Sequence, residues 1–426
     1  MLAEGVRKLE SYLEQNDYAG YDPYDALNGP FLKFFAFNIP RLRLYYQQAF
    51  RRLPINFRAL FGVPHGRNPK GIGLIAYGYL NLYEKTKDEQ YKNKAIDLLE
   101  WLDQNSSKQG HSGHCWGYNF DWQSRAFFLP KGTPTVVNTS FIGKAFVKAY
   151  EVLSERRYLD IARSACDFIL KDLNRSSNSQ SSINNPQFAT PLSRIPHPVS
   201  GILHPVNSQS EICNPKPEIS FCFSYSPIDK YFVHNATALA SSLLALVYGR
   251  TGEKELYEVA RRSILYVVNH QQENGFWFYG EDEVARKTGI DNFHTGFVLE
   301  SLKIYAEATN DHSFDENIKK GLKFYQENFF LPDGAPKYFH NKIFPLDIHS
   351  AAQAIVTLIQ LRDYGADMDL CDRVVNWMIK NMWDEKRGYF YYQKGRFITN
   401  KIPYLRWSQA WAFYALSMYL NYSNRR

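Results

Sequence analysis

Hydrophobic positions follow the helical period along almost the whole chain. In the segment 314–330, Phe314, Ile318, Leu322 and Tyr325 recur at the spacing of one helix face, and charged residues occupy the opposite face. The alternation of two that is typical of strands is confined to short stretches. The pattern therefore predicts an all-α protein.

The predicted helices come in pairs, in which the first helix is largely apolar and the second is amphipathic. The pairs are 71–86 with 91–105, 138–154 with 157–173, 235–252 with 254–271, 292–309 with 314–330, and 347–364 with 369–383. A last apolar segment, 405–420, has no partner after it, but the amphipathic segment 2–15 can supply one. Apolar first helices suit positions surrounded by other helices. The terminal helices are apolar rather than polar caps, so we expect a closed (α/α)6 toroid of about six hairpins rather than an open solenoid.

Short segments rich in aromatic residues and glycine lead into several of the apolar helices. They are 113–128, 274–282, 334–340 and 387–396. Such segments favour short β-hairpins, which we expect at one rim of the ring, beside the first residues of the inner helices. We expect one domain over 1–426 with a long insert at 174–232. The Ser/Asn-rich start of the insert is predicted to be flexible, and "FCFSYSP" (221–227) to be extended and a candidate for lining or closing the site.

Composition narrows the classes of ligand. Aromatic residues make up 16% of the chain, with 30 Tyr and 30 Phe, enough to fill a helical core or to line a cleft that stacks on sugar rings. The net charge of +7, without a long Lys/Arg tract, favours anionic ligands and argues against nucleic acid. Five cysteines without a C-x-x-C pair indicate a reducing compartment. With no signal peptide and no apolar run of spanning length, we expect a cytoplasmic protein without stable membrane insertion.

Polar residues open five of the six predicted inner helices. They are Asn138, Thr139 and Ser140; His234 and Asn235; Asp291, Asn292 and His294; Asp347, His349 and Ser350; and Arg406, Trp407, Ser408 and Gln409. Capping explains the Asn, Asp and Ser residues but not His294, His349 or Trp407. In a ring these helix starts converge, and their free N–H groups suit an anionic group. We therefore expect His294 and His349 to face one shared ligand.

Two kinds of chemistry fit these residues. Asp121, Asp291 and Asp347, with Glu281 as a further acidic candidate, would supply the separated carboxylates of inverting glycoside hydrolysis. Asp121 follows Phe120 and precedes Trp122, an aromatic setting in which we expect a general acid. The sequence favours this hydrolase interpretation.

Proton abstraction next to a uronate carboxylate is the alternative, as in a lyase or an epimerase. Tyr225 together with His234, His294 or His349 would carry it. The residues expected to bind the sugar are Trp116, Trp122, Arg125, Asn138, His234, Asn235, Trp277, His294, His349, Tyr404, Arg406 and Trp407. We expect no metal, since His111, His114 and Cys115 lack partners at ligand spacing. We expect no cofactor, since no nucleotide-binding motif is present.

Five segments carry a resemblance that extends over nearly the whole chain. They are "GYDPYDALN" (20–28), "GYNFDWQSR" (117–125), "GFWFYGED" (275–282), "DNFHTGFVLESLK" (291–303) and "DIHSAAQA" (347–354). The chain resembles the six-hairpin (α/α)6 toroid superfamily, and more narrowly bacterial proteins found with extracellular or capsular polysaccharide biosynthesis genes. Some relatives are called delta-aminolevulinic acid dehydratases. That enzyme is a (β/α)8 barrel, and no strand–helix alternation exists here.

The resemblance implies a carbohydrate-active enzyme that uses the cavity between the inner helices. Its substrate would be an anionic polysaccharide or oligosaccharide, and association with polysaccharide assembly machinery would follow. Glycoside hydrolase is the leading expectation, with polysaccharide lyase or sugar epimerase next. A non-catalytic glycan-binding or assembly protein remains an alternative, and so does an isoprenoid cyclase-like enzyme, although the D-x-D-D motif of such cyclases is not visible.

Overall fold

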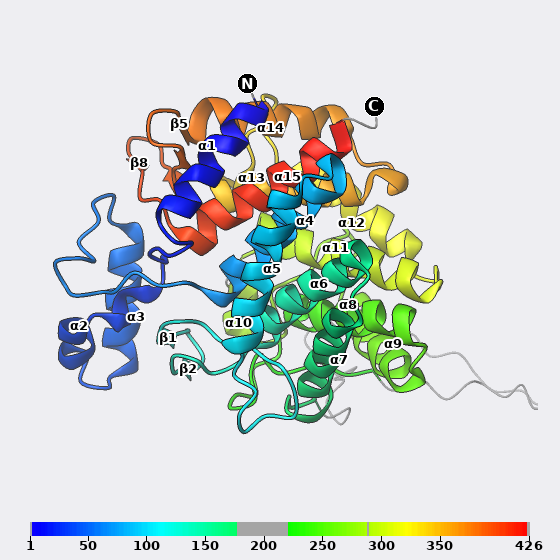
Figure 1. The fold of residues 1–426 in the computed structure, drawn as a ribbon. Coiled ribbons are helices and arrows are strands. Elements are labelled where there is room, and N and C mark those ends of the chain that lie inside the picture. Colours follow the sequence, from blue (N-terminus) through cyan, green and yellow to red (C-terminus); the bar gives the residue numbers. More distant parts are fainter. Residues whose placement is uncertain (1, 177–219, 288, 424–426) are drawn as a thin grey trace, which may run out of the picture.

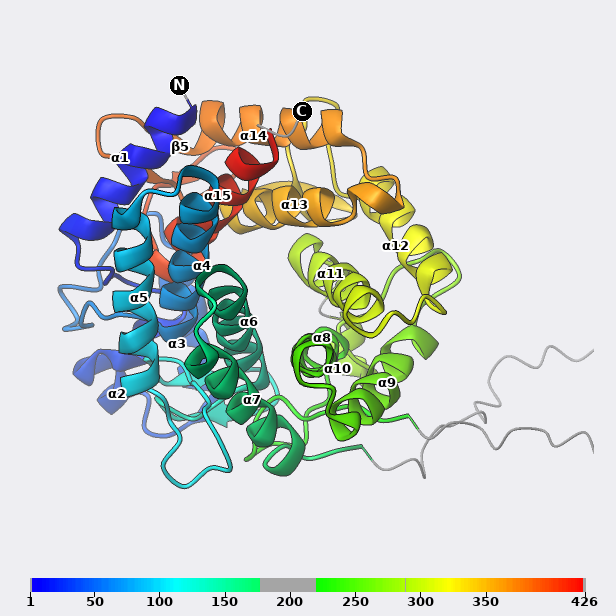
Figure 2. The same ribbon diagram turned by 45° about the vertical axis from the view of Figure 1, so that its right-hand side comes forward.

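Six inner helical segments form a closed ring in the computed structural model, which describes residues 2–176, 220–287 and 289–423. They are α4 (Pro69–Thr86), α6 (Val136–Leu153), α8 (His234–Thr251), α11 (Asn292–Thr309), α13 (Ile348–Gln360), and the π-helical turn η5 (Leu405–Ala410) that continues into α15 (Trp411–Ser423). Each packs against the next, and α15 packs against α4, so the ring closes (Figure 2).

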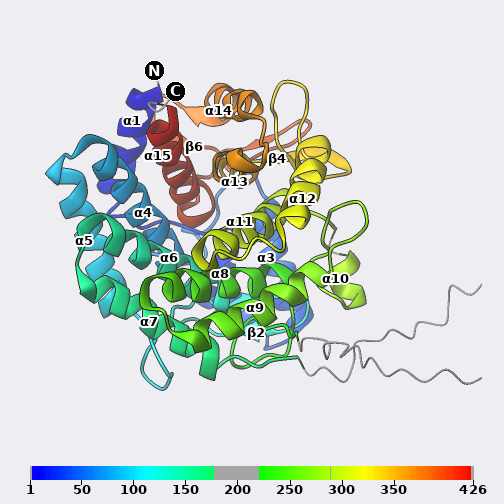
Figure 3. The ribbon, with the colours of Figure 1, turned by 90° about the vertical axis from the view of Figure 1, so that its right-hand side faces the viewer.

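An outer layer of helices surrounds the inner ring. It consists of α5 (Glu89–Gln104), α7 (Arg156–Lys171), α9 (Lys254–Asn269), α12 (Asp315–Asn328), α14 (Met368–Met382) and α1 (Leu2–Gln15). Each outer helix packs on the inner helix before it in the chain, except that α1 packs on α15, so the two ends of the chain share one hairpin (Figure 3). The prediction of an all-α (α/α)6 toroid closed by the N-terminal helix is confirmed.

The difference between inner and outer helices follows from their hydrophobic patterns. In α8 every residue from His234 to Ala245 is buried, whereas α9 buries one stripe and exposes the rest. Close packing of the inner helices needs small residues at contacts. A Cβ at Gly143 of α6 would lie 2.6 Å from the Leu243 side chain of α8, so a larger residue there would force that buried side chain to move.

Short strands at the rim pair in three small antiparallel sheets. Strand β1 (Trp122–Gln123) pairs with β2 (Phe128–Leu129), and β5 (Trp383–Asp384) pairs with β6 (Tyr389–Phe390). The four-stranded sheet has the order β3 (Lys337–Phe339), β4 (Lys342–Asp347), β7 (Gln393–Lys394), β8 (Thr399–Asn400). Three of the four aromatic-glycine segments thus contain strands. The fourth, 274–282, makes only an isolated bridge between Gly280 and Val233, and α10 (Glu283–Lys287) follows it.

The chain between α1 and α4 forms a small helical layer that the pairing pattern does not predict. It contains η1 (Asp25–Asn28), α2 (Pro30–Phe35) and α3 (Pro40–Arg52), and α3 lies against β1 at the rim (Figure 1). Buried Arg58 ties this layer together, because its Nε donates to Oδ1 of Asp25 at 2.6 Å. A further short helix, η4 (Arg362–Tyr364), joins α13 to α14.

The ends of the long insert lie against the ring. Phe223 bridges Arg175, and the segment 221–226 is buried, so Tyr225 reaches the interior. Residues 177–219, where the sequence predicts a flexible segment and a lid, lie outside the described residues. None of the helices in the described ranges is long and apolar enough to cross a bilayer.

Candidate functional site

A cavity of about 490 Å³ opens at the end of the ring where the inner helices begin. Every inner helix contributes a side chain from its first turn to the wall, namely Lys70 of α4, Val137 of α6, Asn235 of α8, His294 of α11, His349 of α13 and Arg406 of η5. Side chains of α3, of the β1–β2 hairpin and of the segment around Tyr225 complete it. The helix starts therefore converge on one space, as the sequence predicts.

Asp291 and His294 form a hydrogen-bonded pair on the cavity wall. Asp291 caps α11 through Oδ1, which accepts the backbone N–H of His294 at 2.9 Å, and its Oδ2 lies 2.7 Å from Nδ1 of the same residue. The carboxylate is buried, whereas the His294 ring keeps 27% of its surface accessible. A carboxylate at Nδ1 favours the tautomer with its proton there, which leaves Nε2 as the proton-accepting nitrogen.

His349 lies in the same wall, separated from His294 by the ring of Phe293. Phe293 stacks on His349 with centroids 4.6 Å apart and contacts His294 at 4.4 Å. Neither nitrogen of His349 has a partner among the described residues. Burial, and then the positive charges of Lys70 and Arg406, lower the pKa of His349 well below its usual value, so the ring is neutral at pH 7. A buried polar ring without a partner is costly, and a bound ligand would satisfy it.

Lys70, the second residue of α4, lies in a cage of aromatic rings at the cavity wall. Its Nζ is 4.0 Å from the centroid of Phe141 and within 5.3 Å of those of Phe297 and Trp411. No carboxylate pairs with it within the described ranges. Burial, and then the charge of Arg406, lower the pKa of Lys70 well below its usual value. An arriving anion would stabilise the protonated amine.

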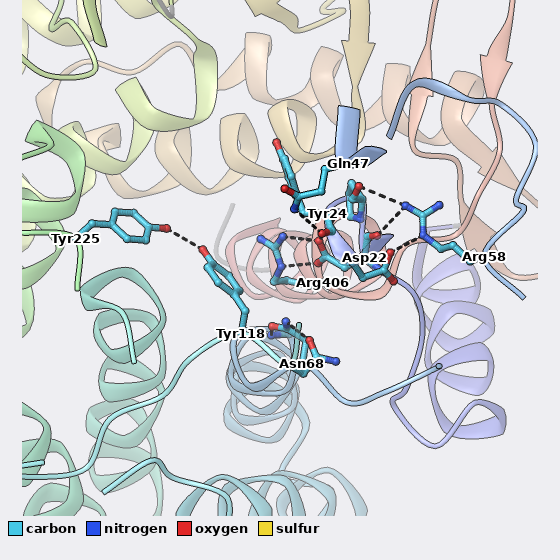
Figure 4. Close-up of polar contacts among 12 residues, drawn as sticks. Asp22, Tyr24, Gln47, Arg58, Asn68, Tyr118, Tyr225 and Arg406 are labelled. Atoms are coloured by element: carbon cyan, nitrogen blue, oxygen red, sulfur yellow. Dashed lines mark hydrogen bonds and ion pairs between the residues drawn. The ribbon is translucent and has the colours of Figure 1, made fainter. Parts of the chain in front are cut away.

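Arg406 is fixed by a buried carboxylate from the other end of the chain. Its Nε and one terminal nitrogen donate to the two oxygens of Asp22 at 2.7 and 2.8 Å (Figure 4). The guanidinium lies over the ring of Tyr118, whose hydroxyl is 2.8 Å from that of Tyr225. Burial, and then the neighbouring Tyr118, raise the pKa of Tyr225 well above its usual value. Tyr225 is therefore a neutral hydrogen-bonding group of the wall.

Asp347 lies behind the wall rather than in it. Its Oδ1 accepts the backbone N–H of His349 at 2.7 Å and the indole N–H of Trp407 at 3.0 Å, and its Oδ2 accepts the amide of Gln393 at 2.6 Å. Burial raises the pKa of Asp347 to about 6. Asp347 thus caps α13 and orients Trp407, which does line the cavity.

The other two acidic candidates are held away from the cavity. Asp121 pairs with Lys33 at 2.7 Å and accepts the backbone N–H of Lys131 at 2.7 Å. Glu281 lies 2.5 Å from Nε2 of His270, and this hydrogen bond lowers the pKa of Glu281 to about 2. Neither residue lines the cavity. Both carboxylates are bound by other residues of the protein and do not reach a substrate in the cavity.

Four of the expected binding residues support the wall from the core. The indole nitrogens of Trp116 and Trp277 donate to backbone carbonyls of α5 and α9, both at 2.8 Å. Tyr404 is buried, with the guanidinium of Arg58 4.7 Å from its ring centroid. Asn138 is buried at the start of α6. By contrast Trp122, Arg125, Asn235, His294, His349, Arg406 and Trp407 line the cavity, together with Asp291 and Tyr225.

Only one group of described residues has the donor atoms and spacing of a metal site. The ligand atoms of His234, His270 and Glu281 lie within 4.8 Å of one another. Each histidine donates Nδ1–H to a backbone carbonyl, at 2.8 Å for His234 and 2.7 Å for His270, which leaves both Nε2 atoms toward the group. Such a set fits zinc. None of the three lines the main cavity, and the expectation of no metal stays a prediction.

Several side chains of the wall were not singled out from the sequence. They are Tyr24, Arg51, Arg52, Lys70, Tyr118, Phe127, Tyr231, Tyr279, Lys287, Tyr338 and Lys342. The position of Lys70 could be predicted from the sequence, because "NPKG" (68–71) opens the first inner helix as "DNFHTG" opens the fourth. The positions of Arg51 and Arg52 could not be predicted, because α3 is outside the pair pattern and only packing brings it over the ring.

The wall is cationic and aromatic. Its basic side chains are Arg51, Arg52, Lys70, Arg125, Lys287, Lys342 and Arg406. Asp291 is the only carboxylate among the described residues that line it. Trp122, Phe127 and Trp407 add flat apolar surfaces. Such a wall suits an anionic ligand that has a face to stack on aromatic rings, as sugars do.

Comparisons with known proteins place the architecture. No family model matches the sequence, and neither does any curated protein. Among solved structures, a cellobiose 2-epimerase from Bacillus thermoamylovorans is 12% identical, with a TM-score of 0.62 and 98% of each chain covered. A family 76 α-mannanase from Bacteroides thetaiotaomicron is 13% identical, with a TM-score of 0.57 and coverage of 84% of this chain and 86% of that one.

A third solved structure is an unsaturated glucuronyl hydrolase specific for heparin. It is 12% identical, with a TM-score of 0.56, and the match covers 85% of this chain and 89% of that one. Likeness at such identities shows the fold and leaves the activity open. The chain has the six-hairpin (α/α)6 toroid fold of these glycosidase-like enzymes.

Proposed function

We propose that this protein is an enzyme that moves a proton at a carbon next to the carbonyl group of an anionic sugar, as epimerases and isomerases do. The observation that carries the proposal is the Asp291–His294 pair in a cavity whose described wall holds no second carboxylate. One positioned histidine and many cations suit proton abstraction better than hydrolysis.

Each partner of the pair has a defined part in this chemistry. Asp291 keeps the proton of His294 on Nδ1, so Nε2 takes the proton from carbon and the carboxylate stabilises the imidazolium that forms. Return of the proton from Nε2 to the neighbouring carbon, while the hydroxyl proton passes to the former carbonyl oxygen, gives an isomer. An epimer forms when a donor on the opposite side of the cavity protonates the other face of the same carbon and Nε2 releases its proton to solvent. Neutral His349 donates a hydrogen bond to the carbonyl oxygen, where negative charge develops.

The charge of the wall selects the substrate class. Lys70 has no anionic partner among the described residues, and the rim cations Arg52 and Lys342 are exposed beside the cavity. A sugar carboxylate or phosphate supplies the missing partner, and Trp122 and Trp407 offer faces for the ring. The substrate is therefore a free acidic sugar or the acidic end of a glycan. Location in the cytoplasm and association with polysaccharide assembly stay predictions.

Hydrolysis, which the sequence favours, needs two carboxylates that flank the scissile bond with room for water. Asp291 is on the wall, but Asp347 is bonded to Trp407 and Gln393 behind it, and Asp121 is paired with Lys33. The solved structures of this fold include an epimerase and hydrolases, so the fold permits either reaction. The positions of these side chains favour the epimerase type.

Exchange of carbon-bound hydrogen with solvent tests the proposal. The protein is incubated in deuterated buffer with free uronic acids, hexose phosphates and the matching neutral hexoses, and proton NMR follows each ring position. We expect deuterium to enter the anionic sugars next to the carbonyl carbon, with a new epimer or isomer. His294→Gln should reduce the exchange rate by roughly a hundredfold or more.

His312→Gln is the matched control. His312 also pairs with an aspartate three positions away, since its Nδ1 lies 3.1 Å from Asp315 at the start of α12, but it is exposed on the outer layer. This variant should exchange at the wild-type rate. An acidic oligosaccharide is included as a further substrate. Release of reducing ends from it without deuterium uptake would show a hydrolase, and unsaturated uronates would show a lyase. Binding of the sugars without any reaction would show a non-catalytic protein.

A further inference from the structure

The large hydrophobic side chains that the described chain exposes gather at the cavity end of the ring. They are Phe31, Phe34, Phe35, Phe37, Ile39, Tyr45, Leu53, Ile55, Leu60, Ile228, Ile343, Phe344, Phe397 and Ile398. Nine of the fourteen belong to α2, α3 and the chain up to residue 60, and four to the β3–β4 and β7–β8 hairpins. In Figure 1, α2, α3 and β8 lie on the left side of the molecule. We call the surface formed by these nine and four side chains the rim face.

The centre of the rim face is a cluster of phenylalanine rings on α2. The Phe34 ring lies 5.3 Å from that of Phe35 and 6.0 Å from that of Phe37, and the Phe34 residue is 69% exposed. The inner face of α2 is already packed, because Leu32 and Ala36 are buried. The outer rings thus add apolar surface that the fold itself does not need, which marks an interaction site.

The rim face borders the mouth of the cavity. Arg52 and Lys342 line the cavity, and each is followed by an exposed apolar residue, Leu53 and Ile343. Asn400 of β8 donates its side-chain amide to the carbonyl of Leu53 at 2.9 Å, which joins the β7–β8 hairpin to the chain after α3. Whatever covers the rim face therefore also lies against the cavity mouth.

The charges around these apolar residues have one sign. Residues 26–83 contain no Asp or Glu, and they contain eight basic residues: Lys33, Arg41, Arg43, Arg51, Arg52, Arg58, Arg67 and Lys70. Residues 387–423 also contain no Asp or Glu. Asp121 pairs with Lys33 and neutralises its charge. Four further basic residues on this side are exposed, namely Arg41, Arg52, Lys342 and Arg396. In a chain with 43 acidic residues, their absence from both stretches leaves the rim face positive.

We propose that the rim face docks the protein on the surface of an anionic lipid bilayer. Phenylalanine rings enter the boundary between headgroups and acyl chains, while arginine and lysine pair with anionic headgroups. A second copy of the same face would set like charges against each other. Docking is peripheral and needs no spanning helix. It presents the cavity mouth to the membrane, within reach of a membrane-anchored glycan.

Sedimentation of the full chain with vesicles tests the proposal. Vesicles of phosphatidylcholine alone are compared with an equal mixture of phosphatidylcholine and phosphatidylglycerol. The wild type should sediment with the mixed vesicles and be released by high salt. Phe34→Glu combined with Phe37→Glu should weaken binding more than about tenfold. Arg41→Glu should weaken vesicle binding by roughly fivefold or more. Lys254→Glu, at an exposed position of outer helix α9, should leave vesicle binding unchanged.

Circular dichroism melting checks that each variant is folded, which we expect because the substituted positions are exposed. The proposal is overturned if the wild type stays in solution with both vesicles, or binds both equally well. It is also overturned if light scattering shows a wild-type oligomer that Phe34→Glu dissociates while no vesicle is bound, because the occupant is then a second copy. Equal binding by the wild type and the Phe34→Glu/Phe37→Glu variant would likewise exclude the rim face.

Discussion

One carboxylate, that of Asp291, both starts helix α11 and orients the histidine three residues later. Its Oδ1 accepts the backbone N–H of His294 at 2.9 Å, and its Oδ2 lies 2.7 Å from Nδ1 of the imidazole. The same side chain is thus a helix cap and the second member of the proposed proton-transfer pair. The two contributions can be separated by substitution, because asparagine caps helices as well as aspartate does.

Asp291→Asn should reduce proton exchange by roughly a hundredfold while the free energy of unfolding changes by less than about 1 kcal/mol. The amide loses the charge that fixes the histidine tautomer but keeps the capping oxygen. Asp367→Asn is the matched control, because Asp367 caps outer helix α14 by accepting the N–H of Leu370 at 2.9 Å. Exchange rates and urea unfolding are measured on both variants. Equal exchange rates in the two would contradict the assignment.

Lys70→Met should make the protein more stable and a poorer binder of anionic sugars. Burial of an amine without a carboxylate partner destabilises the fold, and methionine fits a cage formed by Phe141, Phe297 and Trp411. We expect an increase of about 1–3 kcal/mol in the free energy of unfolding, measured in urea. Affinity for the anionic sugar, measured by calorimetry, should fall by roughly tenfold or more. Exposed Lys342→Met should leave stability unchanged, and a less stable Lys70→Met protein would refute this reasoning.

Asp22→Ala should destabilise the protein by about 3–5 kcal/mol, because it leaves the guanidinium of Arg406 buried without its carboxylate. The pair also joins the chain after α1 to the last inner segment, so its loss weakens closure of the ring. Asp17→Ala is the control, since Asp17 pairs with Arg67 but its side chain is 80% exposed, and its removal should cost less than about 1 kcal/mol. Chemical denaturation measures both. Similar losses of stability in the two variants would show that the buried Asp22–Arg406 pair contributes no more than the exposed pair.

His234 should make the protein less stable in mild acid. Burial, and then the neighbouring His270, lower the pKa of His234 to about 4, below the value of about 6.5 expected in the unfolded chain. Between these values the unfolded chain binds more protons, so the free energy of unfolding falls as the pH falls. His234→Gln should remove about 2 kcal/mol of the difference between pH 7 and pH 5 in urea titrations. Exposed His312→Gln should not. Parallel pH profiles for wild type and His234→Gln would contradict this.

Metal removal should leave the proposed reaction unchanged. The one metal-like group among the described residues, formed by His234, His270 and Glu281, does not line the cavity that holds His294. Treatment with EDTA followed by gel filtration should therefore preserve the exchange rate, and added zinc should not increase it. A rate that disappears with EDTA and returns with zinc would assign the reaction to a metal.

The ring can be predicted from the amino-acid sequence alone. Helical periodicity and the apolar–amphipathic order of the pairs specified the inner and outer layers. A helix that is apolar on all sides is buried between other helices, whereas a helix that is apolar on one side covers them. The polar residues that open the inner helices predicted where a cavity wall would form. Closure by α1 followed from the unpartnered last helix. The small layer of α2 and α3 did not follow, because its helices lie outside the paired pattern and only the contact of α3 with β1, far away in the chain, places it over the rim.

Which of two similar motifs is positioned for chemistry depends on contacts that form only in the folded chain. In "DNFHTG" the histidine comes three residues after the aspartate, and Asp291 reaches its ring from one helical turn away. In "DIHSA" the histidine comes two residues after, so Asp347 bonds only the backbone of His349, and the distant Trp407 and Gln393 take its other lone pairs. Capping is local and can be predicted from the sequence. Which carboxylate lines the cavity depends on side chains that only folding brings near, and no local pattern records them.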